Sequence, residues 1–263
     1  MLWCKPMTEL VTFLPFAFLA LLVGVFIGCV GIGGVLLVPG LVYLLGMDVQ
    51  IAIATCMFSY LFSGAAGAVE YARRGSIRWS MALWLCVGAM PGAYLGAATV
   101  SMLSPRWLEA IIAVLVLFSG IYALRQRAPE IADGTQPGNL GLAAVGGLTG
   151  FGSALSGTGG PLVLIPILVW MKMPLLTAVG LSQVIQLPIA ALASVGNFQL
   201  GEVNIEASLA IAVLLVSGVI VGARIAHRLP AGLLKPMVAG VLIAVGVAMS
   251  GGIIYTTWMN AQV

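Results

Sequence analysis

The sequence predicts an all-α integral membrane protein composed of two inverted-topology repeats. Each repeat is expected to contain four long transmembrane helices and one short helix that is broken or re-entrant. Three observations predict this fold class: an apolar composition, an internal repeat with a fixed spacing, and opposite charge in equivalent loops.

The composition requires lipid as the solvent for most of the chain. Of the 263 residues, 61% are hydrophobic and only 7% are charged, whereas soluble domains carry roughly 25% charged residues. Helices and closed barrels are the structures that cross lipid with every backbone group paired. Barrel strands alternate apolar and polar residues, but runs such as 111–122 and 207–222 are apolar on all sides. We therefore expect helices joined by short loops, with no soluble domain.

Two glycine motifs indicate an internal duplication. Gly31-Ile32-Gly33-Gly34 resembles Gly157-Thr158-Gly159-Gly160, at a spacing of 126 residues. The same spacing pairs further glycines without gaps: Gly24 with Gly150, Gly75 with Gly201, Gly92 with Gly218, Gly96 with Gly222, and Gly120 with Gly246. Matches of leucine or alanine arise readily in an apolar chain, but glycines at one fixed spacing indicate a repeat.

Each half contains five apolar segments in the same order. They span about residues 10–30, 34–45, 51–71, 81–100 and 108–124 in the first half, and 140–156, 161–171, 175–197, 205–226 and 233–254 in the second. The second segment of each half is short, since about twelve residues give ~18 Å of helix against a hydrocarbon core of ~30 Å. We assign residues 1–127 to the first repeat, 128–139 to a polar cytoplasmic linker, and 140–263 to the second repeat.

Equivalent loops of the two halves carry opposite charge. The loop around Gly75 is basic, whereas the equivalent loop around Gly201 is acidic; their charged residues are Arg73, Arg74 and Arg78 against Glu202 and Glu206. The next pair of loops reverses this bias, with Arg106 alone against Arg224, His227, Arg228 and Lys235. Because positive residues mark the cytoplasmic side, equivalent loops are expected on opposite faces, as in an inverted repeat.

The glycine motifs are the strongest candidates for a substrate site. Clustered glycines expose the backbone and allow positive φ, and lipid tolerates such backbone only where it lines a cavity within the protein. Pro161 then begins a short helix, whose free N–H groups and positive dipole end favour an anion. The alternative is that these glycines only allow helices to pack closely.

Polar side chains follow each short helix. Thr55, Ser182 and Gln183 lie within apolar segments and are able to hydrogen-bond an oxyanion; hydrogen bonds between helices are the alternative role. The candidate substrate-binding residues are Gly31, Gly33, Gly34, Thr55, Gly157, Thr158, Gly159, Gly160, Ser182 and Gln183. Charged residues fall near segment ends, so no intramembrane carboxylate indicates a coupling ion.

These features resemble the TauE/SafE family, also called the sulfite or organosulfonate exporter family. Each half of that family carries a G-x-G-G motif, a proline, and an A-x-x-T-S-like motif. This chain shows Gly31 to Gly34 with Pro39 and Ala52 to Cys56, and Gly157 to Gly160 with Pro166 and Ala178 to Ser182. Cys56 and Leu181 replace the usual serine and threonine. The resemblance implies a multi-pass secondary transporter of the bacterial cytoplasmic membrane that exports a small anion, sulfite or an organosulfonate.

The expected partners are the lipid bilayer and that small sulfur-containing anion. The net charge of +3 is scattered along the chain, so we expect no nucleic acid. The four cysteines form no metal-like spacing and the single histidine lies in a basic stretch, so we expect no metal, no cofactor and no enzyme. The alternatives are a passive anion channel of the same fold and, less favoured, an intramembrane enzyme.

Overall fold

The computed structural model describes residues 4–31, 33–125, 138–171 and 173–228, together with residues 243, 247 and 251. Every regular element in these ranges is helical. Most of the predicted linker, 128–139, and of the predicted last segment, 233–254, lies outside the described residues.

The described helices coincide with the apolar segments expected from the sequence. The first half contains α1 (Cys4–Val30), the 3-10 turn η1 (Gly34–Leu36), α2 (Leu37–Leu45), α3 (Val49–Ala72), α4 (Trp79–Met102) and α5 (Pro105–Arg125). The second half contains α6 (Asn139–Ser156), α7 (Pro161–Trp170), α8 (Leu175–Leu200) and α9 (Ile205–Ala226). The second segment of each half, α2 and α7, is short as predicted.

Four of the described helices are long and apolar enough to cross a membrane, judged by length and composition. They are α3 and α4 in the first half and their equivalents α8 and α9 in the second. Large apolar side chains such as Leu83 on α4 and Val213 on α9 are more than 60% exposed. Lipid is the solvent that suits such a surface, because apolar patches of this extent are rare on soluble monomers.

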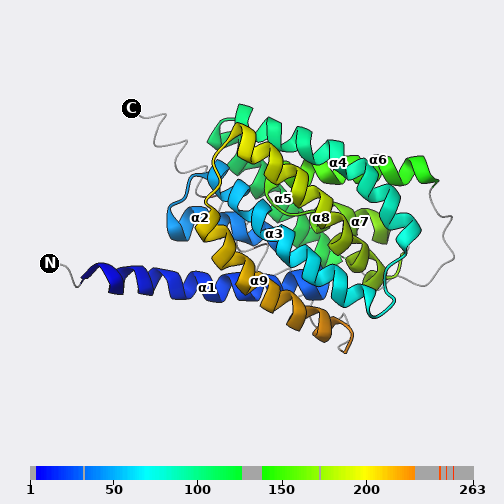
Figure 1. The fold of residues 1–263 in the computed structure, drawn as a ribbon, viewed down its shortest axis with the longest axis horizontal. Coiled ribbons are helices and arrows are strands. Elements are labelled where there is room, and N and C mark those ends of the chain that lie inside the picture. Colours follow the sequence, from blue (N-terminus) through cyan, green and yellow to red (C-terminus); the bar gives the residue numbers. More distant parts are fainter. Residues whose placement is uncertain are drawn as a thin grey trace.

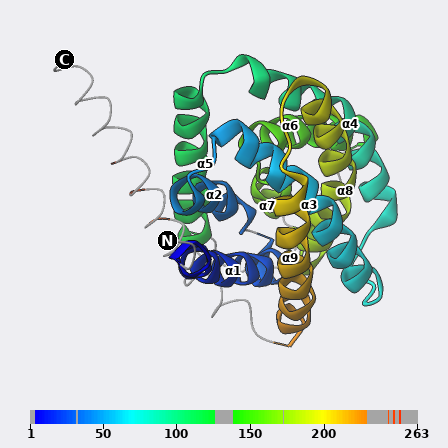
Figure 2. The ribbon, with the colours of Figure 1, turned by 60° about the vertical axis from the view of Figure 1, so that its left-hand side comes forward.

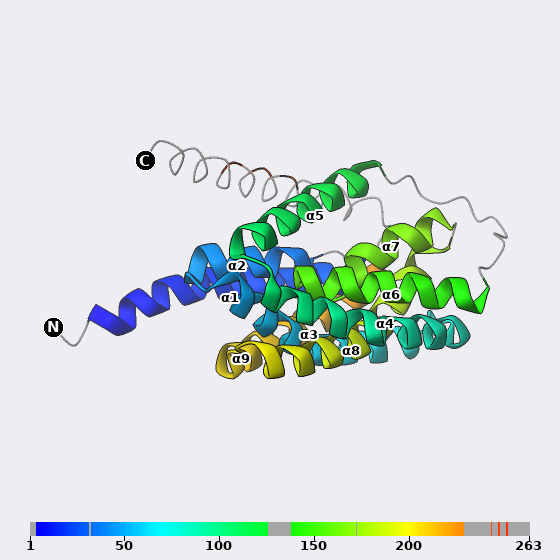
Figure 3. The same cartoon turned by 90° about the horizontal axis from the view of Figure 1, so that it is seen from above.

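Helices at equivalent positions have reciprocal neighbours. Helix α1 packs along α9, and α6, the equivalent of α1, packs along α4, the equivalent of α9. Figure 2 shows these two pairs on opposite sides of the bundle, with α3, α7 and α8 between them. In Figure 1 the same pairs form the upper and lower margins, and in Figure 3 α5 lies at the periphery.

Glycines bring the backbones of both pairs together. A Cβ on Gly150 of α6 would overlap the Ala89 carbonyl of α4, and one on Gly28 of α1 would overlap the Val219 carbonyl of α9. A Cβ on Gly92 would likewise overlap the Gly147 carbonyl. These glycines are therefore packing residues, as small residues are in many membrane helix contacts.

Helix α3 and its equivalent α8 lie side by side and run in opposite directions. Val49 at the start of α3 and Leu200 at the end of α8 line the same pocket. At the other end, a Cβ on Gly180 near the start of α8 would lie 3.3 Å from Tyr71 near the end of α3. This antiparallel pair forms the centre of the bundle, where the glycine motifs are found.

Candidate functional site

The first glycine motif breaks the chain between α1 and η1. Gly31 adopts φ 73°, in the left-handed region, while its N–H donates to Ile27 O at 3.0 Å and so closes the end of α1. Gly33 has φ −165°, which is extended backbone that any residue adopts. Space explains Gly33 instead, since a Cβ there would lie 2.8 Å from Val23 O and 2.9 Å from Phe26 Cβ. Positive φ thus explains Gly31, and close packing explains Gly33.

The second motif makes a sharper break between α6 and α7. Gly157, Gly159 and Gly160 all have positive φ, at 68°, 79° and 118°. Between them, Thr158 donates its N–H to Ser153 O at 3.1 Å, and its hydroxyl lies 3.0 Å from the Ser156 hydroxyl. Pro161 begins α7 directly after the last glycine, as its fixed φ and missing N–H favour.

The two breaks, far apart in sequence, lie against each other inside the protein. A Cβ on Gly34 would lie 2.7 Å from Thr158 O. One on Gly31 would overlap the Ile165 side chain of α7 and lie 3.5 Å from Pro161 Cβ. The described residues of both motifs are buried. The structure therefore brings together seven of the ten residues predicted for the site, namely Gly31, Gly33, Gly34, Gly157, Thr158, Gly159 and Gly160.

Ser182 and Gln183 lie at the first break, on α8. Ser182 Oγ is 3.4 Å from the position of a Cβ on Gly31 and donates to Val179 O at 2.7 Å. Gln183 Nε2 donates to Ile27 O at 3.1 Å, which ties α8 to the end of α1. The buried Gln183 Oε1 has no partner among the described residues, so the atom left without a hydrogen bond there is an acceptor and not the donor that an anion needs.

Thr55 is placed differently. Its hydroxyl contacts Met47 Sδ at 3.9 Å, and its backbone oxygen accepts from Ser59 at 2.8 Å and from Ser208 at 3.2 Å. These contacts belong to the packing of α3 against α9. No described contact joins Thr55 to the glycine breaks.

Tyr60, which the sequence analysis did not select, lies at the breaks beside Gln186, a further amide within an apolar segment. The Tyr60 hydroxyl donates to Gly34 O at 2.7 Å, and a Cβ on Gly159 would lie 2.9 Å from the Tyr60 ring. Gln186 Nε2 donates to Tyr60 O and to Ser63 Oγ, both at 3.1 Å. The repeat contained the signal, because positions 60 and 186 are separated by the same 126 residues as the glycine motifs.

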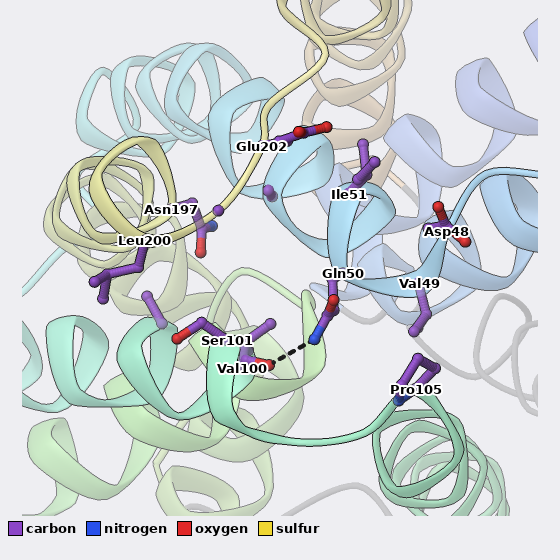
Figure 4. A pocket seen from close by; sticks show the side chains of 13 residues that line it. Asp48, Val49, Gln50, Ile51, Val100, Ser101, Pro105, Asn197, Leu200 and Glu202 are labelled. Carbon is purple, nitrogen blue, oxygen red and sulfur yellow. Dashed lines mark hydrogen bonds between the residues drawn. The ribbon is translucent and has the colours of Figure 1, made fainter.

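A pocket of about 480 Å³ opens at one end of the α3–α8 pair, and no residue of the glycine motifs is among its lining residues. Figure 4 shows Gln50, Ser101, Asn197 and Glu202 around it, with Gln50 donating to Val100 O at 3.2 Å. Asn197 is only 5% exposed, and its Nδ2 has no partner among the described residues. The sequence analysis did not predict this pocket, because its walls come from segments separated by more than half of the chain.

Comparison with known proteins identifies the family. The chain matches the family described as sulfite exporter TauE/SafE over residues 16–249. It is 25% identical over 241 residues to "Probable membrane transporter protein YdhB" of Bacillus subtilis, covering 84% of this chain and 96% of that protein. It is 24% identical over 269 residues to "Probable membrane transporter protein MJ0441" of Methanocaldococcus jannaschii, covering 90% and 98%. No solved structure matches the chain. The match extends over nearly the whole chain and both glycine motifs, and the chain belongs to the sulfite exporter TauE/SafE family of membrane transporters.

Proposed function

We propose that this protein is a secondary transporter that exports a small sulfur-containing anion, sulfite or an organosulfonate, across the bacterial cytoplasmic membrane. The observation that carries the proposal is the meeting of the two glycine breaks, where Gly34 lies against the Thr158 carbonyl. Backbone that no side chain covers and the start of α7 lie there together, at the interface between the two halves. The family name supports the class of substrate.

An inverted repeat accounts for this arrangement. Contacts along α3 and its equivalent α8 place the two helices in opposite directions. Contacts along α9 supply a second line of support: Ser59 meets Ser208, and Arg74 meets Ala223, so α9 runs parallel to α3. Its equivalent α4 runs beside α8, where a Cβ on Gly196 would lie 2.9 Å from Ala97 Cβ. Equivalent elements of opposite direction imply a pseudo-two-fold axis in the membrane plane.

The charge distribution then orients the molecule. Arg74 contacts Ala223 and His227, so the basic end of α3 and the basic end of α9 meet at one end of the bundle. Asp48 and Glu202 line the pocket at the other end. By the positive-inside rule, the Arg74 end faces the cytoplasm and the pocket faces outward.

The glycine breaks can hold an anion without a fixed positive charge. An ion entering a low-dielectric interior bears a Born cost of order 20 kcal/mol before relaxation. The N-terminal N–H groups and dipole of α7, directly after Gly160, offset part of that cost. The Thr158 and Ser182 hydroxyls lie at the same breaks and are able to turn toward a ligand. Neutral donors release an anion more readily than a buried arginine would, which suits transport.

The test is anion flux in proteoliposomes that contain the purified protein. Radiolabelled sulfite and methanesulfonate should cross in a saturable manner, and chloride should not compete. A flux that never saturates would support the passive channel of the same fold. Absence of flux for both sulfur anions, from protein that is folded and inserted, would contradict the proposed function.

A further inference from the structure

The pocket lined by Gln50, Ser101, Asn197 and Glu202, called the outer pocket from here on, has an equivalent position at the other end of the molecule. Applying the spacing of 126 residues to its lining residues pairs Asn197 with Tyr71, Glu202 with Ser76, Ser101 with His227, Ala97 with Ala223, and Ala54 with Gly180. Two equivalent halves of opposite direction should therefore build a second pocket at the basic end. The structure fills that place with side chains.

A cluster of hydrogen bonds occupies the place of the second pocket. Arg74 Nη1 donates to Ala223 O at 2.7 Å and to His227 Nδ1 at 3.0 Å. His227 Nδ1 also lies 2.7 Å from Ala223 O, and the other ring nitrogen, Nε2, lies 3.2 Å from Ser76 Oγ. The Tyr71 ring packs against the imidazole with centroids 5.0 Å apart. We call these four side chains, Tyr71, Arg74, Ser76 and His227, the latch.

The latch joins the two halves, and its residues pack closely against the start of α8. Its members come from the end of α3 and the following loop in the first half, and from the end of α9 in the second half. A Cβ on Gly180, the counterpart of pocket residue Ala54, would lie 3.3 Å from each of Tyr71, Ser76 O and Ile77. The Tyr71 hydroxyl also donates to Gly28 O of α1 at 2.8 Å.

One carboxylate contacts two guanidinium groups in the latch region. Glu70, one turn before Arg74, contacts Arg74 at 3.1 Å and Arg224 at 3.7 Å. The guanidinium of Arg74 is thus oriented by a carboxylate on one side while it donates to α9 on the other. A hydrogen bond from a charged donor is about twice as strong as a neutral one, so Arg74 is the strongest link between the halves at this end.

We propose that the latch is the cytoplasmic gate of the transport path, closed in this structure while the outer pocket is open. The proposal rests on the proposed function and adds to it the residues that alternate access between the two membrane faces. In the opposite conformation the latch opens and the outer pocket closes, because a pseudo-two-fold molecule has an equivalent arrangement at each end. The hydrogen bonds of the latch stabilise one of the two conformations, and they therefore raise its population relative to the other.

The first experiment measures the conformation without measuring transport. In a background with all four cysteines replaced, Ser101→Cys reports the outer pocket through its labelling by a membrane-impermeant maleimide from outside. Arg74→Gln combined with His227→Ala should slow this labelling roughly three- to tenfold, because losing a charged and a neutral hydrogen bond shifts a two-state equilibrium by one or two orders of magnitude. Arg73→Gln, which removes the same charge from the adjacent exposed residue, should leave the labelling rate unchanged. Equal rates in the latch variant and its parent, or equal slowing by Arg73→Gln, would overturn the proposal.

The second experiment closes the gate covalently. Ser76→Cys and His227→Cys in one chain place two thiols across the latch, and a short bifunctional methanethiosulfonate reagent bridges them. Bridging, verified by mass, should abolish sulfite flux, and reduction of the bridge should restore it; recovery shows that the variant is folded. Full flux in the bridged protein would overturn the gate and leave the proposed function intact. A wild-type protein without sulfite flux would contradict the proposed function, while the labelling experiment would still decide the gate.

Discussion

Gln186 donates a hydrogen bond of 3.1 Å to the backbone oxygen of Tyr60, the residue at the equivalent position of the other half. The two side chains flank the glycine breaks, because Tyr60 donates to Gly34 O and its ring lies beside Gly159. A contact between two equivalent residues is expected close to a pseudo-two-fold axis. The proposed binding site therefore lies where the two halves meet.

Tyr60→Phe should lower both stability and substrate affinity. The substitution removes the side-chain donor of the buried Gly34 carbonyl, which keeps only the Leu37 N–H as a donor, and a hydrogen bond of this kind contributes about 0.5–1.5 kcal/mol. Thermal unfolding in detergent measures the stability, and sulfite binding measures the affinity. The control is Tyr94→Phe, whose hydroxyl bonds Gln199 at 3.2 Å on the exposed surface and should matter little. Equal effects from both substitutions would show that Tyr60 has no special role at the breaks.

Gly159→Val should strongly weaken binding of the anion. Gly159 has φ 79°, which a branched residue strongly resists, and its Cβ would press on the Tyr60 ring at 2.9 Å. Because charge-assisted hydrogen bonds contribute about 1.5–3 kcal/mol each, losing one or two should weaken binding by roughly ten- to a thousandfold. Gly33→Val should act in the same direction through crowding alone.

The matched control for these site variants is Gly138→Val, at the exposed start of α6, where φ is −60° and a Cβ would meet none of the described residues within 4 Å. It should bind sulfite like the wild type. Normal binding by a folded Gly159→Val protein would place the site elsewhere and leave the glycine motifs as helix contacts.

Gly150→Ala should destabilise the protein much more than Gly147→Ala in the same helix. A Cβ on Gly150 would overlap the Ala89 carbonyl, so α4 and α6 must separate, whereas one on Gly147 would lie 3.4 Å from Gly88 O. Overpacking of this kind costs about 1–3 kcal/mol. Melting temperatures of the two variants in one detergent check the expectation. Similar melting temperatures of the two variants would contradict the close contact between α4 and α6 at Gly150.

Arg73→Cys and Glu202→Cys should label from opposite sides of the membrane. The two residues are exposed and lie in loops that occupy equivalent positions in the two halves. The proposed inverted repeat places Arg73 in the cytoplasm and Glu202 outside. Impermeant maleimide applied to right-side-out and inside-out vesicles distinguishes the two faces. Labelling of both residues from one side would contradict the inverted repeat.

The sequence by itself determined the helices, the duplication and the membrane environment. The short helices α2 and α7 could be predicted because the glycines and Pro161 act locally on the backbone. The repeat was visible because glycines such as Gly24 and Gly150 are needed wherever two helix backbones touch. The family followed from the same two motifs.

The tertiary structure decided how each predicted site residue is used. Gly33 and Gly159 occupy equivalent positions, yet Gly33 is extended at φ −165° and Gly159 left-handed at 79°. Thr55 turned out to pack between α3 and α9. The Thr55 hydroxyl contacts Met47 Sδ, eight residues away, while its backbone oxygen accepts from Ser208, 153 residues away. A one-dimensional pattern carries no information on the distant partner, because only the fold brings it close.

The difference between the two ends of the molecule also belongs to the tertiary structure. Two equivalent halves predict the same arrangement at each end. Asn197 nevertheless lines an open pocket, while its counterpart Tyr71 packs on His227. In the proposed gate, the physical reason is that contacts between the halves, led by the hydrogen bonds of Arg74, hold the basic end closed.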